Sequence, residues 1–230
     1  ISPINSRFTF KDDKLLLGKT DQSSDNFDIL LFVRRDASEI EIPSNIKIIS
    51  SYAFEYCTKL QSVKIPENSE LQIIDKFSFS NSSIRKIYIP QHVSIIDEYA
   101  FFYSNLQKVE FSNTSELKVI EKWGFYKTKI KKIFIPDNVV KICENSFGYC
   151  VELIKVEFSE NSKLEVIKNM AFNYTNFTSF RIPKNVKKIG FNALCSSKLQ
   201  IVEITENYQP KYFTFQNNLK YLTMIPLSLK

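Results

Sequence analysis

The apolar residues of this chain recur in one pattern along most of its length. A short element in which apolar, polar and apolar residues alternate appears eight times, and successive copies start 22 to 24 residues apart. Since successive side chains of a strand point to opposite faces, the two apolar residues should point inward and the residue between them outward. The apolar pairs are Ile40/Ile42, Val63/Ile65, Ile87/Ile89, Val109/Phe111, Ile133/Ile135, Val156/Phe158, Phe180/Ile182 and Val202/Ile204. This period, with one short strand per copy, indicates a repeat solenoid.

Further positions recur in each copy. Proline often follows the strand, which must end there because proline lacks an N–H and holds the preceding residue extended. A residue suited to left-handed backbone then marks a turn: Asn45, Asn68, Asn138, Asn161, Asn185 and Asn207, with His92 in the same place of another copy. Apolar residues at spacings of three to four follow, which suits a short helical or extended return segment. The last recurring residue is large and apolar: Phe54, Phe79, Phe101, Phe125, Phe147, Phe172 and Leu194.

Odd and even copies differ in length. The distance from the end of the strand element to the repeat phenylalanine is 12 residues in Ile42/Phe54, and 14 in the next copy, Ile65/Phe79. The same alternation continues through the next four copies. The sequence therefore indicates that a unit of two repeats was duplicated.

The pattern predicts a single elongated domain, 1–230, in three parts. Residues 1–38 do not fit the repeat and contain strand-like runs, so we expect an N-terminal cap that covers the apolar end of the first coil. Residues 39–208 hold about eight repeats, and residues 209–230 are either a degenerate last repeat or a C-terminal end. The predicted fold is a right-handed coil with a parallel concave β-sheet and short helical or irregular convex segments.

Composition narrows the choice of partners. With 31 basic against 25 acidic residues the formal net charge is +6, which biases the chain toward acidic partners but is too dilute for a dedicated nucleic-acid binder. The four glycines form no phosphate-binding motif, which excludes nucleotide cradles. No apolar stretch approaches the roughly 18 residues of a membrane span, and residues 1–10 do not resemble a signal peptide. We expect a mature or excised ectodomain or a soluble protein, without direct membrane insertion by this segment.

The chain lacks the side chains that catalysis or metal binding would need. Convergent histidines, cysteines and carboxylates are required for such sites, but His92 is the only histidine and its position indicates a turn. Cys57 and Cys150 occupy a small buried position of the repeat, four repeats apart, so about 19 Å should separate them, beyond disulfide reach. Cys143 and Cys195 stand at other positions. We expect four reduced thiols, no metal, no cofactor and no catalytic residue.

The outward stripe of the strands is the best candidate for a binding site. Its positions form a ladder of four lysines with two outward aromatic residues beside it, and like charges at strand spacing repel each other. The opposite interpretation is a merely solvated face in which Glu110 and Glu157 offset the lysines. The candidate partner-binding residues are Lys86, Tyr88, Lys108, Glu110, Lys132, Phe134, Lys155, Glu157 and Arg181.

Two copies carry the family signal most clearly: IPDNVVKICENSFGYC (135–150) and FSENSKLEVIKNMAF (158–172). They resemble the BspA-like class of leucine-rich repeats, found in surface proteins of bacteria and protists. The resemblance covers about residues 39–208, and the stretch DILLFVRRD (28–36) also looks like the protist members. The ordinary leucine-rich pattern L-x-x-L-x-L-x-x-N is not matched, because proline stands at the strand exit and Ile, Val and Phe replace Leu.

The resemblance implies cell-surface adhesion or binding of host proteins without catalysis, and it supplies no site residue. The leading hypothesis is an extracellular or surface-displayed module that binds a protein, such as a host matrix or cell-surface protein, through the concave sheet. A cytoplasmic leucine-rich-repeat scaffold for protein–protein interaction is the alternative, and a signal peptide or membrane span in the precursor would argue against it. An enzyme is disfavoured, because only carboxylate pairs could serve and no spacing singles one out.

Overall fold

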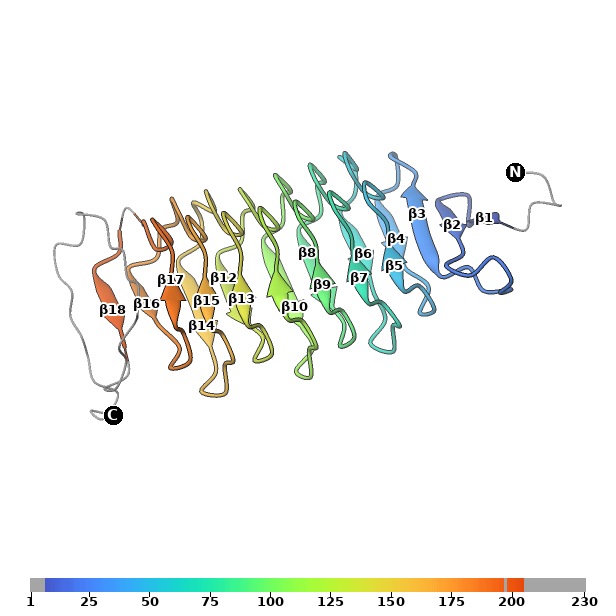
Figure 1. Cartoon of the computed structure of the whole chain (residues 1–230). Coiled ribbons are helices and arrows are strands. Elements are labelled where there is room, and N and C mark those ends of the chain that lie inside the picture. The colour runs from blue at the N-terminus through green and yellow to red at the C-terminus, as the bar shows by residue number, and fades with distance from the viewer. Residues whose placement is uncertain (1–6, 197, 205–230) are drawn as a thin grey trace.

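The computed structural model describes residues 7–196 and 198–204, and Figure 1 shows them as an elongated solenoid of stacked coils. Each coil opens with one of eight longer strands, each beginning one residue before the first apolar residue of the predicted element. We number the coils 1 to 8 by these strands: β4 (Glu39–Glu41), β6 (Ser62–Lys64), β8 (Lys86–Ile89), β10 (Lys108–Phe111), β12 (Lys132–Ile135), β14 (Lys155–Phe158), β16 (Ser179–Arg181) and β18 (Ile201–Glu203). The predicted repeat solenoid with parallel strands is confirmed.

The longer strands pair two by two. Parallel ladders join β4 to β6, β8 to β10, β12 to β14 and β16 to β18. Each ladder joins an odd coil to the even coil that follows it. The hydrogen-bonded pairs therefore coincide with the two-repeat unit that the sequence indicates.

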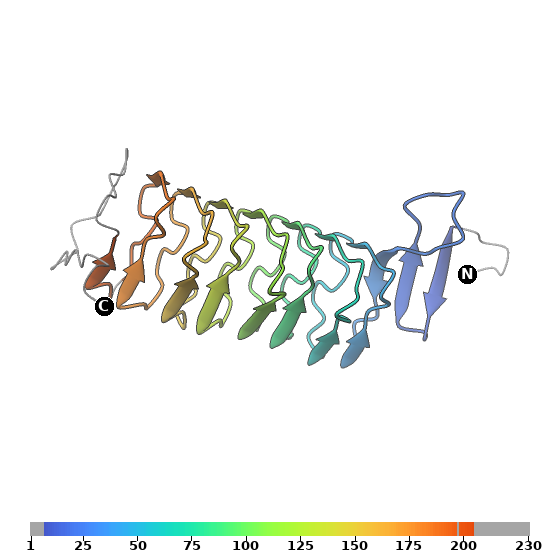
Figure 2. The same ribbon diagram turned by 90° about the horizontal axis from the view of Figure 1, so that it is seen from below.

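The continuous sheet lies on the other side of the coils, along the edge opposite the longer strands in Figure 2. It is built from two-residue parallel strands in the return segments: β5 (Ile48–Ile49), β7 (Ile73–Ile74), β9 (Ile95–Ile96), β11 (Val119–Ile120), β13 (Lys141–Ile142), β15 (Val166–Ile167) and β17 (Lys188–Ile189). In the described part of the chain no residue is helical, so the return segments are extended or irregular and the helical form of the prediction is wrong.

Left-handed residues explain the absence of helix. After each short strand the chain makes successive tight turns, and in coils 1 to 6 two residues four positions apart have positive φ, such as Tyr52 (φ 64°) and Tyr56 (φ 54°). A right-handed helix requires negative φ throughout, so it cannot pass these points. Apolar residues three or four positions apart are compatible both with a helix and with these turns, so spacing in the sequence does not distinguish the two conformations.

The N-terminal strands extend the same sheet. β1 (Phe8–Lys11) pairs antiparallel with β2 (Leu15–Gly18), which pairs antiparallel with β3 (Ile29–Val33), and β3 is parallel to β5. Asp28 fixes the entry to β3: its carboxylate accepts hydrogen bonds from the Thr20 N–H (2.8 Å) and hydroxyl (2.6 Å). Burial opposes its ionisation, but these bonds and Lys47 outweigh burial and lower the pKa of Asp28.

A column of phenylalanine rings runs through the core. Six repeat phenylalanines are fully buried, and neighbouring ring centroids are 4.4 to 5.2 Å apart in nearly parallel planes. Three residues after each ring stands a small buried side chain, and in coils 2, 4 and 6 its hydroxyl donates to the carbonyl of the phenylalanine. The Thr128 hydroxyl donates to the Phe125 carbonyl (3.0 Å), and the Cys150 thiol donates to the same carbonyl from the next coil (3.0 Å). This confirms the small buried position predicted for Cys57 and Cys150.

The turn asparagines do not adopt the left-handed backbone that was predicted for them. None of Asn45, Asn68, Asn138, Asn161 and Asn185 has positive φ, and neither has His92. Asn207 lies outside the described residues. Instead, side-chain amides donate to a carbonyl of the preceding turn: Asn138 to Ser115 (2.8 Å), Asn185 to Ser162 (2.7 Å) and Asn45 to Phe27 (2.9 Å). These asparagines hold neighbouring coils together, while left-handed backbone occurs near the repeat phenylalanine.

Candidate interaction surface

The outward side chains of the longer strands form what we call the long-strand face, the side predicted to be concave. Strand register places Lys86 beside Lys108 in one ladder and Lys132 beside Lys155 in another. All four lysines are exposed. The structure therefore places the predicted lysines at matching positions of successive coils.

Carboxylates on the same strands neutralise two of these lysines. Lys108 forms an ion pair with Glu110, and Lys155 forms one with Glu157. The hydrogen bond from Lys108, followed by its charge, lowers the pKa of Glu110. Within the described chain, Lys86 and Lys132 have no ion pair.

Arg181 has a different carboxylate partner. It lies beside Glu203 in register but binds Glu160 of the preceding coil, with an N–O distance of 2.6 Å. Arg181 is therefore held at the edge of the face, and the free positive charge of the predicted site is concentrated at Lys86 and Lys132.

Aromatic and aliphatic side chains lie among these charges. The Phe134 side chain is 46% exposed and stands beside Glu157 in register, while Tyr88 is half-buried beside Glu110. Ile154, which immediately precedes β14, is 53% exposed. It was not among the predicted residues, although the residue at this position is polar in the other seven copies and the exception at Ile154 was a signal that could have marked it.

Phe134 also borders a shallow hollow of about 360 Å³ at the strand exits of coils 4 to 6. The rest of its lining is mostly polar and includes Asn113, Asn138, Asn161 and Lys163. Lys163 donates to the Asn138 side chain (2.8 Å), so this wall is ordered by bonds between coils. An apolar anchor beside a polar hollow suits recognition of a protein surface.

The described residues offer no metal site or membrane span. No group of three or more His, Cys, Asp and Glu side chains between residues 7 and 204 could hold a metal ion. His92 lies in a turn, and its Nδ1 is 3.2 Å from the Glu116 carboxylate. No helix in the same part of the chain is long and apolar enough to cross a membrane.

The four cysteines differ in accessibility. Cys57, Cys143 and Cys150 are buried, Cys195 is half-exposed, and no disulfide joins any of these described residues. Burial raises the pKa of Cys150 to about 11 and, with the nearby Glu121 carboxylate, that of Cys143 to about 12. Burial also raises the pKa of Cys57.

We expect one thiol of the folded protein to react quickly with Ellman's reagent at pH 8. The thiolate is the reacting form, and raising the pKa of a thiol lowers its thiolate fraction at that pH. Cys195 should react within minutes, while the three buried thiols should react only as the protein unfolds. In guanidinium chloride all four should be titrated. Rapid release of more than one equivalent from folded protein would contradict this assignment.

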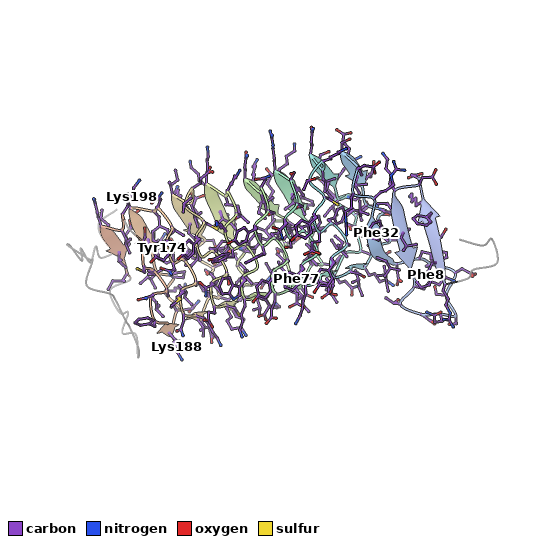
Figure 3. The ribbon with its side chains drawn as sticks, turned by 90° about the horizontal axis from the view of Figure 1, so that it is seen from above. Phe8, Phe32, Phe77, Tyr174, Lys188 and Lys198 are labelled. Atoms are coloured by element: carbon purple, nitrogen blue, oxygen red, sulfur yellow. The ribbon has the colours of Figure 1, made fainter. Side chains whose placement is uncertain are left out.

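A second aromatic surface was missed from the sequence. In coils 1 to 4 the residue two positions before the repeat phenylalanine is aromatic: Tyr52, Phe77, Tyr99 and Trp123. Their rings stack on one another, with centroids 5.2, 4.6 and 5.9 Å apart. Figure 3 shows Phe77 and Tyr174 between the longer strands and the short strands, where Lys188 marks β17. The recurrence was visible in the sequence, but its outward direction depends on left-handed backbone that the pattern does not reveal.

Comparison with known protein families identifies the repeat from which the coils are built. A family model described as the BspA type leucine rich repeat region, in six copies, matches residues 30–154 and 118–229. The chain belongs to the BspA-type leucine-rich repeat family. The resemblance noted in the sequence is thereby confirmed, and proteins built from BspA-type repeats are typically non-catalytic binding modules. No curated protein matches the sequence.

Solved structures share the BspA-type solenoid. A leucine-rich repeat protein from Eubacterium ventriosum covers 94% of this chain with a TM-score of 0.72 and 20% identity. The pneumococcal vaccine antigen PcpA covers 87% with a TM-score of 0.60 and 21% identity. A leucine-rich repeat protein from Bacteroides ovatus covers 84% with a TM-score of 0.55 and 21% identity. This chain spans 55%, 50% and 55% of those chains respectively, about half of each, and at these identities the likeness shows the fold alone.

Proposed function

We propose that this BspA-type protein is a non-catalytic adhesion module at the cell surface, which engages host or extracellular proteins or other cells through the long-strand face. Membership of the family supports a protein-binding repeat module. The name of PcpA, a pneumococcal vaccine antigen, supports exposure at the surface of a cell. The cytoplasmic scaffold remains the alternative.

The observation that carries the proposal is the setting of Phe134. Its ring is 46% exposed on a regular strand, in the same strand as Lys132, which has no ion pair within the described chain. An aromatic side chain on a rigid strand loses little conformational entropy on binding, and aromatic residues dominate the energy of protein interfaces. A lysine without a neutralising carboxylate adds attraction for acidic surfaces and raises the association rate.

Solid-phase adhesion to a basement-membrane matrix and to mammalian cell monolayers tests this proposal. The double variant Phe134→Ala/Tyr88→Ala should bind at least about 30-fold more weakly, because an interface hot spot contributes about 2 kcal/mol or more. Lys86→Ser/Lys132→Ser should slow association at low salt, and this defect should shrink at high salt. Lys108→Ser/Lys155→Ser is the matched control with a smaller effect, because carboxylates already neutralise those lysines.

The lysine variants should melt at the wild-type temperature because these lysines are exposed, and the aromatic variant should melt slightly below it because Tyr88 is half-buried. If every variant adheres like the wild type at both salt concentrations, the long-strand face is not the binding site. Location is tested by antibody labelling of intact cells. Labelling only after the cells are permeabilised would support the intracellular scaffold instead.

A further inference from the structure

Four stacked aromatic rings of coils 1 to 4, of which Tyr52 is exposed and the other three are half-buried, occupy strained backbone. Tyr52, Phe77, Tyr99 and Trp123 have φ between 56° and 64°, a region that costs a residue with a β-carbon roughly 1–2 kcal/mol. Coils 5 and 7 place Asn145 and Asn192 at the corresponding point, and asparagine is among the few non-glycine residues that visit this region routinely. Coils 1 to 4 thus carry large apolar rings where the backbone favours small polar residues.

More aromatic side chains continue this strip along the same face. Phe102 stacks on Tyr126 (centroids 5.4 Å apart), and Tyr149 lies 4.5 Å from Tyr174. Tyr56 is 59% exposed and Tyr174 is 53% exposed. We call this surface, from coil 1 to coil 6, the aromatic strip. The strip alternates exposed rings with half-buried ones, and a row of partly exposed aromatic side chains favours an interaction site over a merely solvated surface.

A ladder of alternating charge runs beside the strip, one residue before each left-handed position. Coils 2 to 5 present, in order, Lys76, Glu98, Lys122 and Glu144. Backbone hydrogen bonds from each coil to the next align these positions, and Lys76 forms an ion pair with Glu98 (3.2 Å). Read from the opposite end, the ladder has every charge reversed in sign. It is therefore complementary to itself when one copy runs antiparallel to the other.

We propose that two copies of this chain associate antiparallel through the aromatic strip. The two-fold axis of this dimer lies in the plane of the interface, perpendicular to the solenoid and between coils 3 and 4. It sets coil 3 of one copy against coil 4 of the other, with residues at equivalent repeat positions facing each other. Glu98 of one copy then faces Lys122 of the other, and Lys76 faces Glu144. A two-fold axis along the solenoid would instead set each coil against the same coil, which loses this charge pairing.

The same axis matches the rings. Tyr99 of one copy faces Trp123 of the other, Phe102 faces Tyr126, and Tyr56 faces Tyr174. The aromatic strip extends from coil 1 to coil 6, so its midpoint coincides with the midpoint of the charge ladder. Charge order therefore selects this axis, and the rings of coils 3 and 4 at the centre of the strip are compatible with it.

Neighbouring acidic groups are already engaged within their own chain. The Asp75 carboxylate accepts the Lys76 N–H (2.8 Å), and the Asp97 carboxylate accepts the Glu98 N–H (2.6 Å). Asp75 also accepts the Ser51 hydroxyl (2.8 Å), so both carboxylates have hydrogen-bond partners within their own chain. Lys76 and Glu98 are also paired within the chain, so the contact between Glu98 of one copy and Lys122 of the other carries the test of charge recognition.

The length of the aromatic strip limits the affinity expected for the dimer. Six coils at about 4.8 Å span about 25 Å, so the surface buried by both copies should fall at or below the low end of the standard range, about 1,200 Å². We therefore expect a reversible dimer whose population rises with concentration in the micromolar range. The long-strand face stays open in this dimer, so adhesion through that face is tested separately.

Sedimentation velocity between 1 and 500 µM at low salt tests the dimer. Wild-type protein should shift from monomer to dimer, and Lys122→Glu should weaken association at least tenfold by setting carboxylate against carboxylate. Glu98→Lys should do the same. The double variant Glu98→Lys/Lys122→Glu should restore the dimer, and an equimolar mixture of the two single variants should form a heterodimer. Lys118→Glu is the matched control, an exposed lysine of the same coil that precedes β11, whereas Lys122 follows β11.

Thermal melting of each variant shows that the fold is retained. A protein that stays monomeric throughout this range overturns the proposal. So does a dimer that Lys122→Glu and Lys118→Glu weaken equally, because the strip would then play no special part. Failure of the double variant to restore association rules out the antiparallel arrangement, even if both single variants are monomers.

Discussion

Replacing Phe125 with alanine is expected to lower the free energy of unfolding by about 3–5 kcal/mol. The ring is fully buried in the middle of the phenylalanine column, with neighbouring centroids 5.1 and 5.2 Å away in coils 3 and 5. Truncation removes both stacking contacts and leaves a cavity that the flanking coils cannot fill, because backbone bonds to their neighbours hold them in place. Guanidinium unfolding followed by circular dichroism measures the change.

The position of the lost ring should also change how the protein unfolds. A solenoid is stabilised mainly by contacts between neighbouring coils, so a weak coil in the middle divides it into two parts. We expect the single transition of the wild type to broaden or split in Phe125→Ala. Phe134→Ala is the control, since it removes an exposed ring of the next coil and should cost less than about 1 kcal/mol. Equal losses in the two variants would contradict the importance of the column.

Gly190→Ala is expected to destabilise the protein by about 1–3 kcal/mol. A β-carbon built on Gly190 would lie 2.5 Å from the Asn169 backbone nitrogen and 2.8 Å from the Lys168 carbonyl carbon of the preceding coil. Backbone atoms cannot rotate away as a side chain can, so coils 6 and 7 must separate. Asn169 also accepts the Phe191 N–H (3.0 Å), and this bond should be strained by the same shift.

Gly124→Ala provides a matched control for this prediction. The same added methyl group would come no closer than 3.2 Å to a backbone atom, the Glu121 oxygen. Thermal melting of both variants should show the larger loss for Gly190→Ala. A loss at Gly124 equal to that at Gly190 would show that close packing of coils is not the cause.

The repeated side chains made much of the fold predictable. Strand alternation at Ile133/Ile135 placed β12 to within one residue, and the same rule placed the other long strands. The burial of Phe125 and Cys150 also followed from their fixed places in the repeat. These features depend on the polarity of side chains, which the sequence displays directly.

Other features depend on backbone conformation or on a choice among partners. Residues such as Tyr52 and Trp123 adopt positive φ because the coil must turn there, although neither residue favours it. On the long-strand face the sequence left two interpretations open: repulsion between adjacent lysines, or a solvated face in which Glu110 and Glu157 offset them. Whether Lys108 pairs with Glu110 of its own strand depends on side-chain direction, which spacing does not fix. Strand register brought the predicted residues onto one face, and their role in binding remains a proposal.

The hydrogen bonds between coils align the peptide groups of the turn segments, so that these groups have a net dipole along the solenoid. The N–H groups of Phe54, Phe79 and Phe101 all point to carbonyls of the next coil, so the dipoles of these peptide groups add, as they do in a helix. The carbonyls of coil 1 form the negative end of this row. Arg35 lies there: its guanidinium donates to the Ala53 carbonyl (2.8 Å). The turn after β3 therefore supplies a positive charge to the negative end of this row of peptide groups, as a lysine or arginine does at the C-terminus of a helix.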